Sequence, residues 1–209
     1  MDFFKEREMV AKAMCRLYNR NLTTASGGNI SLRINKELVA ITPSGLDKGE
    51  LKADQIAIVS MNGENHTPFL KLSIESEMHL QILRNREDVM AIVHAHPAHA
   101  TAFTALKGSI NTRYWVESYY VLGDPVLVDY APSGSIELAN KVGEYAIKNN
   151  VLMLENHGIL TLGSSLFEAY DRMELVERTA EMNLYQLQSG LEKKVLSLQE
   201  IAYIDRMHG

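Results

Sequence analysis

The chain has 209 residues, of which 46% are hydrophobic and 22% charged, with a single cysteine. These proportions are typical of a globular protein and exclude a collagen, a coiled coil and a disordered chain. With 21 basic and 26 acidic residues the net charge is −5, so we expect no nucleic-acid partner. No apolar run approaches the ~20 residues of a membrane span. The charged start and the lone Cys15 predict a cytoplasmic protein without a secretory signal.

Hydrophobic spacing predicts both helices and strands. An amphipathic helix is expected over 3–18, followed by a hairpin of strands 30–34 and 38–41 and by a third strand at 56–59. Beyond it, the predicted helices are 74–84, 98–106, 136–147, 166–187 and 198–207, and the predicted strands are 90–93, 151–154 and 159–162. This order predicts a single domain over 1–209 of the α/β class, with a central mixed or antiparallel sheet flanked by helices.

Two histidines follow an apolar strand in the run Val93-His94-Ala95-His96-Pro97. Side chains two residues apart on a strand point to the same side, so both imidazoles can converge on one point. Two neutral imidazoles at this spacing suit zinc, which commonly takes nitrogen ligands. The pair alone is equally compatible with partly buried histidines that bond to backbone carbonyls.

A third histidine, His157, also follows an apolar strand and precedes a glycine. The edge of a sheet can gather side chains from several strand ends, and a catalytic zinc needs three protein ligands and one open position. We therefore expect His94, His96 and His157 to share a metal ion. His79 and His99 lie in predicted helices, where structural or packing roles are expected instead.

Glu75 stands near the start of the predicted helix 74–84, two residues before Glu77. Beside a dication, a carboxylate at this place can act as a fourth ligand or as a general base. Without other information the simpler interpretation is preferred, in which either carboxylate complements the helix dipole.

Two glycine turns offer anion sites, Ser26-Gly27-Gly28-Asn29 and Thr42-Pro43-Ser44-Gly45. Glycine lets backbone N–H groups approach an anion closely, and serine and asparagine add hydrogen bonds. Each turn is weak support by itself, because such turns often exist for conformational reasons. The sequence contains no GxGxxG, Walker or GxSxG motif, so it predicts no dinucleotide, Walker-type nucleotide or serine-hydrolase site.

Five motifs, taken together and in order, resemble the class II aldolase family. They are the two glycine turns, Ser73-Ile74-Glu75, His94-Ala95-His96-Pro97 and Asn156-His157-Gly158. The resemblance extends from about Met9 to Leu187. It implies one Zn²⁺ per subunit bound by the three histidines, with Glu75 both approaching the metal and moving a proton. It also implies that a substrate phosphate is held by Ser26, Gly27, Asn29, Ser44, Gly45 and Ser73.

The resemblance further implies a substrate and a mechanism. A ketose 1-phosphate, expected to be L-fuculose 1-phosphate, would be cleaved reversibly into dihydroxyacetone phosphate and L-lactaldehyde. Zinc would supply the electron sink, Glu75 would protonate the carbon left by cleavage, and Tyr119 or Tyr120 would act at the aldehyde oxygen. A homotetramer with sites between subunits is also implied.

The sequence departs from the family pattern at one position and leaves related activities open. The family often carries Pro-Ser-Ser-Glu where this chain has Leu72-Ser73-Ile74-Glu75, so Ile74 removes one hydroxyl from the phosphate site. Epimerases acting on L-ribulose 5-phosphate typically have aspartate at the position of Glu75, and adducin-like binding modules lack the three histidines. A methylthioribulose 1-phosphate dehydratase and an oxo-tetronate phosphate decarboxylase share most of these motifs. Lys48 does not separate them and is equally compatible with a solvated surface lysine.

Overall fold

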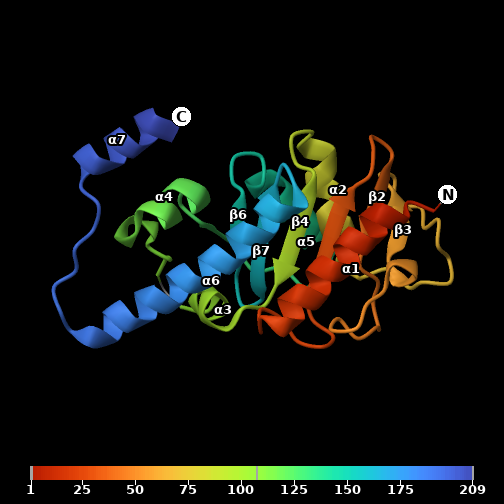
Figure 1. The fold of residues 1–209 in the computed structure, drawn as a ribbon, viewed down its shortest axis with the longest axis horizontal. Helices are drawn as coiled ribbons and strands as arrows, with labels where there is room; N and C mark the ends of the chain where they lie inside the picture. The colour runs from red at the N-terminus through yellow and green to blue at the C-terminus, as the bar shows by residue number, and fades with distance from the viewer. Residues whose placement is uncertain (1, 107, 209) are drawn as a thin grey trace.

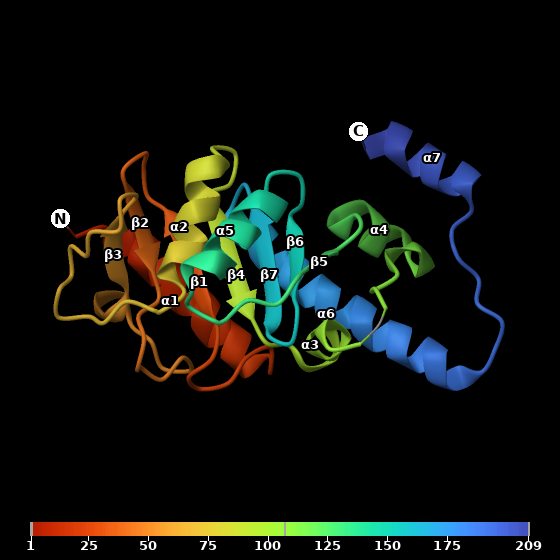
Figure 2. The same ribbon diagram turned by 180° about the vertical axis from the view of Figure 1, so that it is seen from behind.

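The computed structural model describes residues 2–106 and 108–208, which form a seven-stranded sheet with helices on both faces (Figures 1 and 2). The strands are β1 (Asn29–Arg33), β2 (Leu38–Ile41), β3 (Ala57–Ser60), β4 (Ala91–Ala95), β5 (Val126–Val128), β6 (Val151–Leu154) and β7 (Gly158–Gly163). The helices are α1 (Phe4–Asn19), α2 (Ser76–Asn85), α3 (Ala98–Thr104), α4 (Val116–Leu122), α5 (Ile136–Tyr145), α6 (Leu166–Ser189) and α7 (Leu198–His208). Two 3₁₀ turns, η1 (Ala53–Gln55) and η2 (Thr112–Tyr114), complete the elements.

The strand order is β3-β2-β1-β4-β7-β6-β5, and every neighbouring pair is antiparallel except β5 and β6. The predicted α/β class with a mixed, mainly antiparallel sheet is confirmed, as are the hairpins β1–β2 and β6–β7. Hydrophobic spacing does not predict β5 or α4. With three and seven residues, these elements are too short to display a period.

Alternate residues of the central strand β4 face opposite layers of the fold. Ala91, Val93 and Ala95 pack in the core beneath α1 and α6, whereas Ile92 packs in the core beneath α2 and α5. His94 lies two residues after Ile92, so its ring is on the α2 side. Because helices cover both faces, functional side chains gather at one end of the sheet, where β4 ends and β1 and β7 begin.

The helix α7 follows an extended segment and packs against α4 rather than against the sheet (Figures 1 and 2). The Tyr119 hydroxyl of α4 donates a hydrogen bond of 3.1 Å to Asp205 of α7. Within residues 2–106 and 108–208, the helices are all too short or too polar to cross a membrane.

Candidate active site

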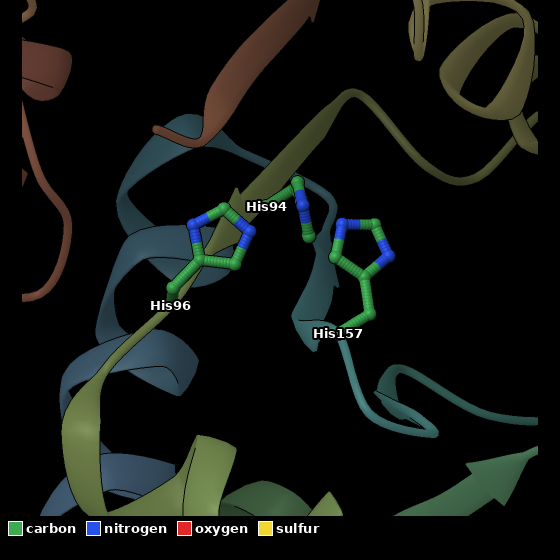
Figure 3. Close-up of side chains that lie close together, drawn as sticks. All are labelled: His94, His96 and His157. Atoms are coloured by element: carbon green, nitrogen blue, oxygen red, sulfur yellow. The ribbon is translucent and has the colours of Figure 1, made fainter. Parts of the chain in front are cut away.

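Three histidine rings meet at this end of the sheet (Figure 3). His94 belongs to β4, His96 follows the last residue of β4, and His157 lies in the turn between β6 and β7. The ring centroid of His94 is 4.8 Å from that of His96 and 4.9 Å from that of His157. One ligand atom from each residue lies within 4.8 Å of the other two. The structure therefore brings together the three residues expected to bind a metal ion.

The hydrogen bonding of His94 leaves one ring nitrogen fit for a cation. Its Nδ1 lies 2.9 Å from the carbonyl oxygen of Ile159, which can only accept, so Nδ1 carries the proton. Its Nε2 is buried and has no hydrogen-bond partner in the described part of the chain. Burial lowers the pKa of His94 to about 3, so the ring is neutral near pH 7. A neutral, desolvated nitrogen whose ring is oriented by a carbonyl is what a metal site requires.

Two glycines make room for these rings. A Cβ atom at Gly158 would lie 2.6 Å from Cδ2 of His96 and 2.7 Å from the carbonyl oxygen of Ala95, which is closer than side chains tolerate. A Cβ atom at Gly27 would lie 3.0 Å from Nδ1 of His96. Gly27 belongs to the first glycine turn, so this anion-binding candidate lies directly beside the histidine cluster.

Glu75 occupies the N-cap position of α2 and lies between two of the histidines. Its Oε2 is 3.5 Å from Nε2 of His94, and its Oε1 is 3.0 Å from Nε2 of His157. Burial raises the pKa of this carboxyl, but His94 and hydrogen bonds from His157, Ser133 and Asn29 outweigh burial and hold it well below its usual range. Glu75 is thus an ionised carboxylate within reach of a cation held by the histidines.

Two side chains hold the Glu75 carboxylate in place. Nδ2 of Asn29 donates to Oε2 at 2.7 Å and to the Ser73 hydroxyl at 3.2 Å. The Ser133 hydroxyl donates to Oε1 at 2.8 Å. Asn29 stands directly opposite His94 in the β1–β4 register, which explains how a residue of the first glycine turn reaches the carboxylate. Asn29 thereby links the expected phosphate residues to the expected proton-transfer residue.

Ser133 is a site residue that the sequence analysis missed. It lies between 107 and 135, where no element was predicted, and the turn Pro132-Ser133-Gly134-Ser135 was the signal that could have found it. Gly134 has φ +75°, and a Cβ atom there would lie 3.0 Å from Cβ of Ile74. Ile74, which is 64% exposed, therefore stands beside the turn that carries Ser133.

Backbone hydrogen bonds join the two glycine turns and the Ser73 segment. Pro43 forms a β-bridge with Leu72, and the amide of Ser44 donates to the carbonyl oxygen of Lys71 at 2.8 Å. The amide of Lys48 donates to the carbonyl oxygen of Ala25, also at 2.8 Å. Three segments far apart in sequence are thus tied together next to the histidines. They carry the expected phosphate residues Ser26, Gly27, Asn29, Ser44, Gly45 and Ser73.

Lys48 is not a solvated surface lysine. Its side chain is buried, with the residue 2% exposed, and Nζ donates to the carbonyl oxygen of Pro43 at 2.5 Å. No carboxylate among the described residues pairs with it. Burial lowers the pKa of this amine to about 8. Lys48 was compatible with a surface position because a lone lysine in a turn carries no sequence mark of burial. Its side chain bonds to Pro43 of the second glycine turn and its amide bonds to Ala25 beside the first, so Lys48 connects the two turns.

The remaining candidates lie outside the histidine cluster. The Tyr119 hydroxyl bonds to Asp205, and Tyr120 is half exposed in the same helix, α4. His99 pairs with Glu177 at 2.8 Å, in keeping with the packing role expected for it. His79 is fully buried beneath the site and bonds to two polar side chains of β1, in keeping with the structural role expected for it.

Comparisons with known proteins agree with this arrangement. The family model described as Class II Aldolase and Adducin N-terminal domain matches residues 8–184. The chain is 40% identical over 171 residues to an L-fuculose phosphate aldolase of Methanococcus maripaludis, covering 81% of this chain and 92% of that protein. It is 29% identical over 187 residues to a 3-oxo-tetronate 4-phosphate decarboxylase of Haemophilus influenzae, covering 87% and 88%. A solved structure of an L-fuculose 1-phosphate aldolase is 31% identical, with a TM-score of 0.87 and coverage of 97% and 95%. The chain therefore belongs to the Class II Aldolase and Adducin N-terminal domain family, in which it is an enzyme of the aldolase type.

Proposed function

We propose that this protein is a zinc-dependent aldolase that reversibly cleaves a ketose 1-phosphate into dihydroxyacetone phosphate and a small aldehyde. The substrate pair we favour is L-fuculose 1-phosphate and L-lactaldehyde. One observation carries the proposal: Nε2 of His94 is buried, has no hydrogen-bond partner among the described residues, and lies in a cluster of histidines that borders the Glu75 carboxylate. The 40% identity to an L-fuculose phosphate aldolase, in an alignment that covers 81% of the chain, supports the choice of substrate.

His94, His96 and His157 are the residues that would hold the metal ion, and Glu75 stands close enough to join them. A bound Zn²⁺ would supply Lewis-acid polarisation of the substrate carbonyl, so that no lysine imine is needed. Nitrogen ligands suit zinc, and three of them leave a position open for substrate.

The rest of the chemistry belongs to side chains of the chain itself. The two glycine turns and Ser73 would hold the phosphate and thereby place C3 of the ketose beside Glu75. When the C3–C4 bond breaks, the C4 hydroxyl loses its proton and C3 gains one. In the direction of condensation, the ionised Glu75 would take a proton from C3, and Tyr119 or Tyr120 would give a proton to the aldehyde oxygen that becomes the C4 hydroxyl. Cleavage is the reverse, so that Glu75, protonated in the complex, returns its proton to C3 and the tyrosine takes the proton of the C4 hydroxyl.

The proposal extends to the assembly and setting of the protein. We propose that residues 1–209 act as one catalytic domain, in a homotetramer with sites between subunits. Tyr119 lies in α4, and its hydroxyl donates a hydrogen bond to Asp205 of α7. A site completed between subunits would give the tyrosines of α4 a route to substrate. The single cysteine, Cys15, suits a reducing cytoplasm.

Three related activities and one binding module are the alternatives. The glutamate at position 75 disfavours the epimerase, and the complete histidine cluster disfavours an adducin-like binding module. The dehydratase and the decarboxylase share most of the motifs, and the decarboxylase is supported by 29% identity to the Haemophilus influenzae protein. These last two are separated from an aldolase by their products.

The test is a condensation assay on the purified protein with added Zn²⁺. Dihydroxyacetone phosphate and L-lactaldehyde should yield a new ketose phosphate, with other short aldehydes run in parallel. Exhaustive chelation should abolish the reaction and Zn²⁺ should restore it. Failure with every aldehyde, together with release of carbon dioxide from 3-oxo-tetronate 4-phosphate, would favour the decarboxylase. Full activity after chelation, or no stoichiometric divalent metal, would overturn the proposal.

A further inference from the structure

We propose that His79 is a positioning residue for proton transfer, which acts by fixing the direction of the Asn29 amide so that both of its N–H groups face Ser73 and Glu75. The inference rests on the proposed function in one respect, the role of Glu75 in moving a proton. The hydrogen-bond direction itself does not depend on that role.

A continuous chain of buried polar side chains leads from His79 to Glu75. Nδ1 of His79 lies 2.8 Å from the hydroxyl of Ser31, and Nε2 of His79 contacts Oδ1 of Asn29. On its other side, Nδ2 of Asn29 donates to Ser73 and, at 2.7 Å, to Glu75. Both Asn29 and His79 are nearly or fully inaccessible to solvent.

The direction of each hydrogen follows from what each group can donate. Nδ2 of Asn29 donates its two hydrogens to Ser73 and Glu75, so the atom facing His79 is the carbonyl oxygen Oδ1. A carbonyl oxygen only accepts, so Nε2 of His79 must carry the proton and Nδ1 must accept. The Ser31 hydroxyl then donates to Nδ1. Every hydrogen in the chain points toward the site.

A primary amide needs this kind of support. Rotating the Asn29 amide by half a turn exchanges Oδ1 and Nδ2 with almost no change in shape, and it would set a carbonyl oxygen against the Glu75 carboxylate. The N–H of His79 opposes that rotation, because the turned amide would offer it a second donor. Burial lowers the pKa of His79 to about 4, so the ring stays neutral with a single ring proton near pH 7.

The fold explains why His79 reaches this place. Asn29 and Ser31 are two residues apart on β1, so they share the face of the sheet that α2 covers. His79 lies one helical turn after Glu75 on α2. The same helix therefore presents the carboxylate and the residue that orients its hydrogen-bond donor.

The test compares His79→Gln with His79→Leu, because glutamine keeps an N–H donor near the position of Nε2 and leucine does not. The readouts are bound zinc, the KM for dihydroxyacetone phosphate and the rate of proton exchange at its C3. We expect His79→Leu to keep zinc and KM but to lose exchange by about ten-fold, the worth of one net hydrogen bond. We expect His79→Gln to recover most of that rate. Equal exchange rates in the two variants would refute the inference. So would a His79→Leu variant that loses zinc and has a raised KM in parallel with its loss of rate.

A second pair of variants guards against failure of His79→Leu to fold. Ser31→Ala removes the hydroxyl that holds Nδ1 as an acceptor, and we expect it to slow exchange about three-fold. The matched control is Thr179→Val, which removes an equally buried hydroxyl that donates to Leu175 in α6, and it should leave exchange unchanged. An unimpaired Ser31→Ala, or an equal loss in the control, would count against the chain described above.

The ring proton can also be located without catalysis. Nitrogen-15 NMR of the intact zinc-loaded protein should show the His79 proton on Nε2, and a proton on Nδ1 would refute the inference. Because the NMR measurement needs no catalysis, it tests the role of His79 separately from the proposed function.

The exchange assay separates the two proposals as well. A wild-type protein that exchanges no C3 proton contradicts the role of Glu75, whereas normal exchange in His79→Leu contradicts only the role of His79.

Discussion

The hydroxyl of Ser133 donates a 2.8 Å hydrogen bond to Oε1 of Glu75, across 58 residues of sequence. The serine comes from the turn before α5 and the glutamate from the N-cap of α2. These two helices pack against each other on one face of the sheet. The contact shows that the carboxylate is held from both sides, by Ser133 on one oxygen and by Asn29 on the other.

Replacing Ser133 should therefore change the Glu75 carboxylate without changing the histidines. In Ser133→Ala, Glu75 loses one donor, and its pKa should move up toward the usual range because that donor stabilises the charged form. We expect proton exchange at C3 of dihydroxyacetone phosphate to fall by roughly three- to ten-fold with zinc content unchanged. Ser135→Ala, at the N-cap of α5, is the control for damage to the same turn. An equal loss in both variants would argue for a general effect on the turn.

Replacing Glu75 itself separates metal binding from proton transfer. Glu75→Gln keeps the shape of the side chain but removes its basic oxygen. Because three histidines remain, we expect zinc to be retained and C3 proton exchange to fall by roughly 10²-fold or more. The measurement is exchange of label from solvent into dihydroxyacetone phosphate. An unimpaired rate would remove Glu75 from its assigned role.

The two histidines on either side of Pro97 offer a matched test of the metal site. His96 belongs to the cluster, whereas His99 pairs with Glu177 away from it. We expect His96→Ala to lose stoichiometric zinc and condensation activity, since two imidazoles remain where a catalytic zinc takes three protein ligands. His99→Ala should retain both. Metal analysis of the dialysed proteins decides, and zinc retention by His96→Ala would mean that the ion is held elsewhere.

Ile74 stands where the family motif often has a second serine, and it is largely exposed beside Gly134. We expect Ile74→Ser to lower the KM for dihydroxyacetone phosphate by roughly three- to ten-fold, because a new hydroxyl can donate to the phosphate. Ile74→Ala, which shortens the side chain without adding a donor, should not produce this change. Equal KM values for the serine and alanine variants would show that position 74 does not reach the phosphate.

Lys48 predicts a pH dependence of stability. Its pKa is about 8 in the folded protein against an ordinary value of 10.5, so the unfolded chain holds the proton more tightly between these values. Stability conferred at position 48 must then rise with pH through that window. Relative to Lys48→Met, the wild type should gain about 3 kcal/mol of unfolding free energy between pH 7.5 and 10.5.

The measurement is urea unfolding of both proteins at several pH values, in the absence of substrate. Lys12→Met, at an exposed lysine of α1, is the control and should show no such difference from the wild type. A constant difference between the wild type and Lys48→Met across the pH range would mean that Lys48 is solvated in the folded protein.

The sequence by itself predicted most of the fold and the three histidines that the structure brings together. Segments with a repeated pattern, such as the long helix α6 and the alternating strand β1, were predictable because the pattern recurs over several turns or residues. His94 in β4 and His96 just after it were predictable as a pair, because the strand period places their side chains on one side. His157 was predictable because it, like His94 and His96, comes at the end of an apolar strand, and because a glycine follows it.

Only the tertiary structure decided which distant groups touch. Ser133, the burial of Lys48 and the His79–Asn29–Glu75 chain all depend on packing between segments some 20 to 60 residues apart, which local periodicity does not encode. Burial then changed the chemistry of these groups, because removing water lowered the pKa values of Lys48 and His79 and left Nε2 of His94 without a hydrogen-bond partner among the described residues. Residue types are written in the sequence, but their protonation and their partners follow from desolvation, which exists only once the sheet and its helices have assembled.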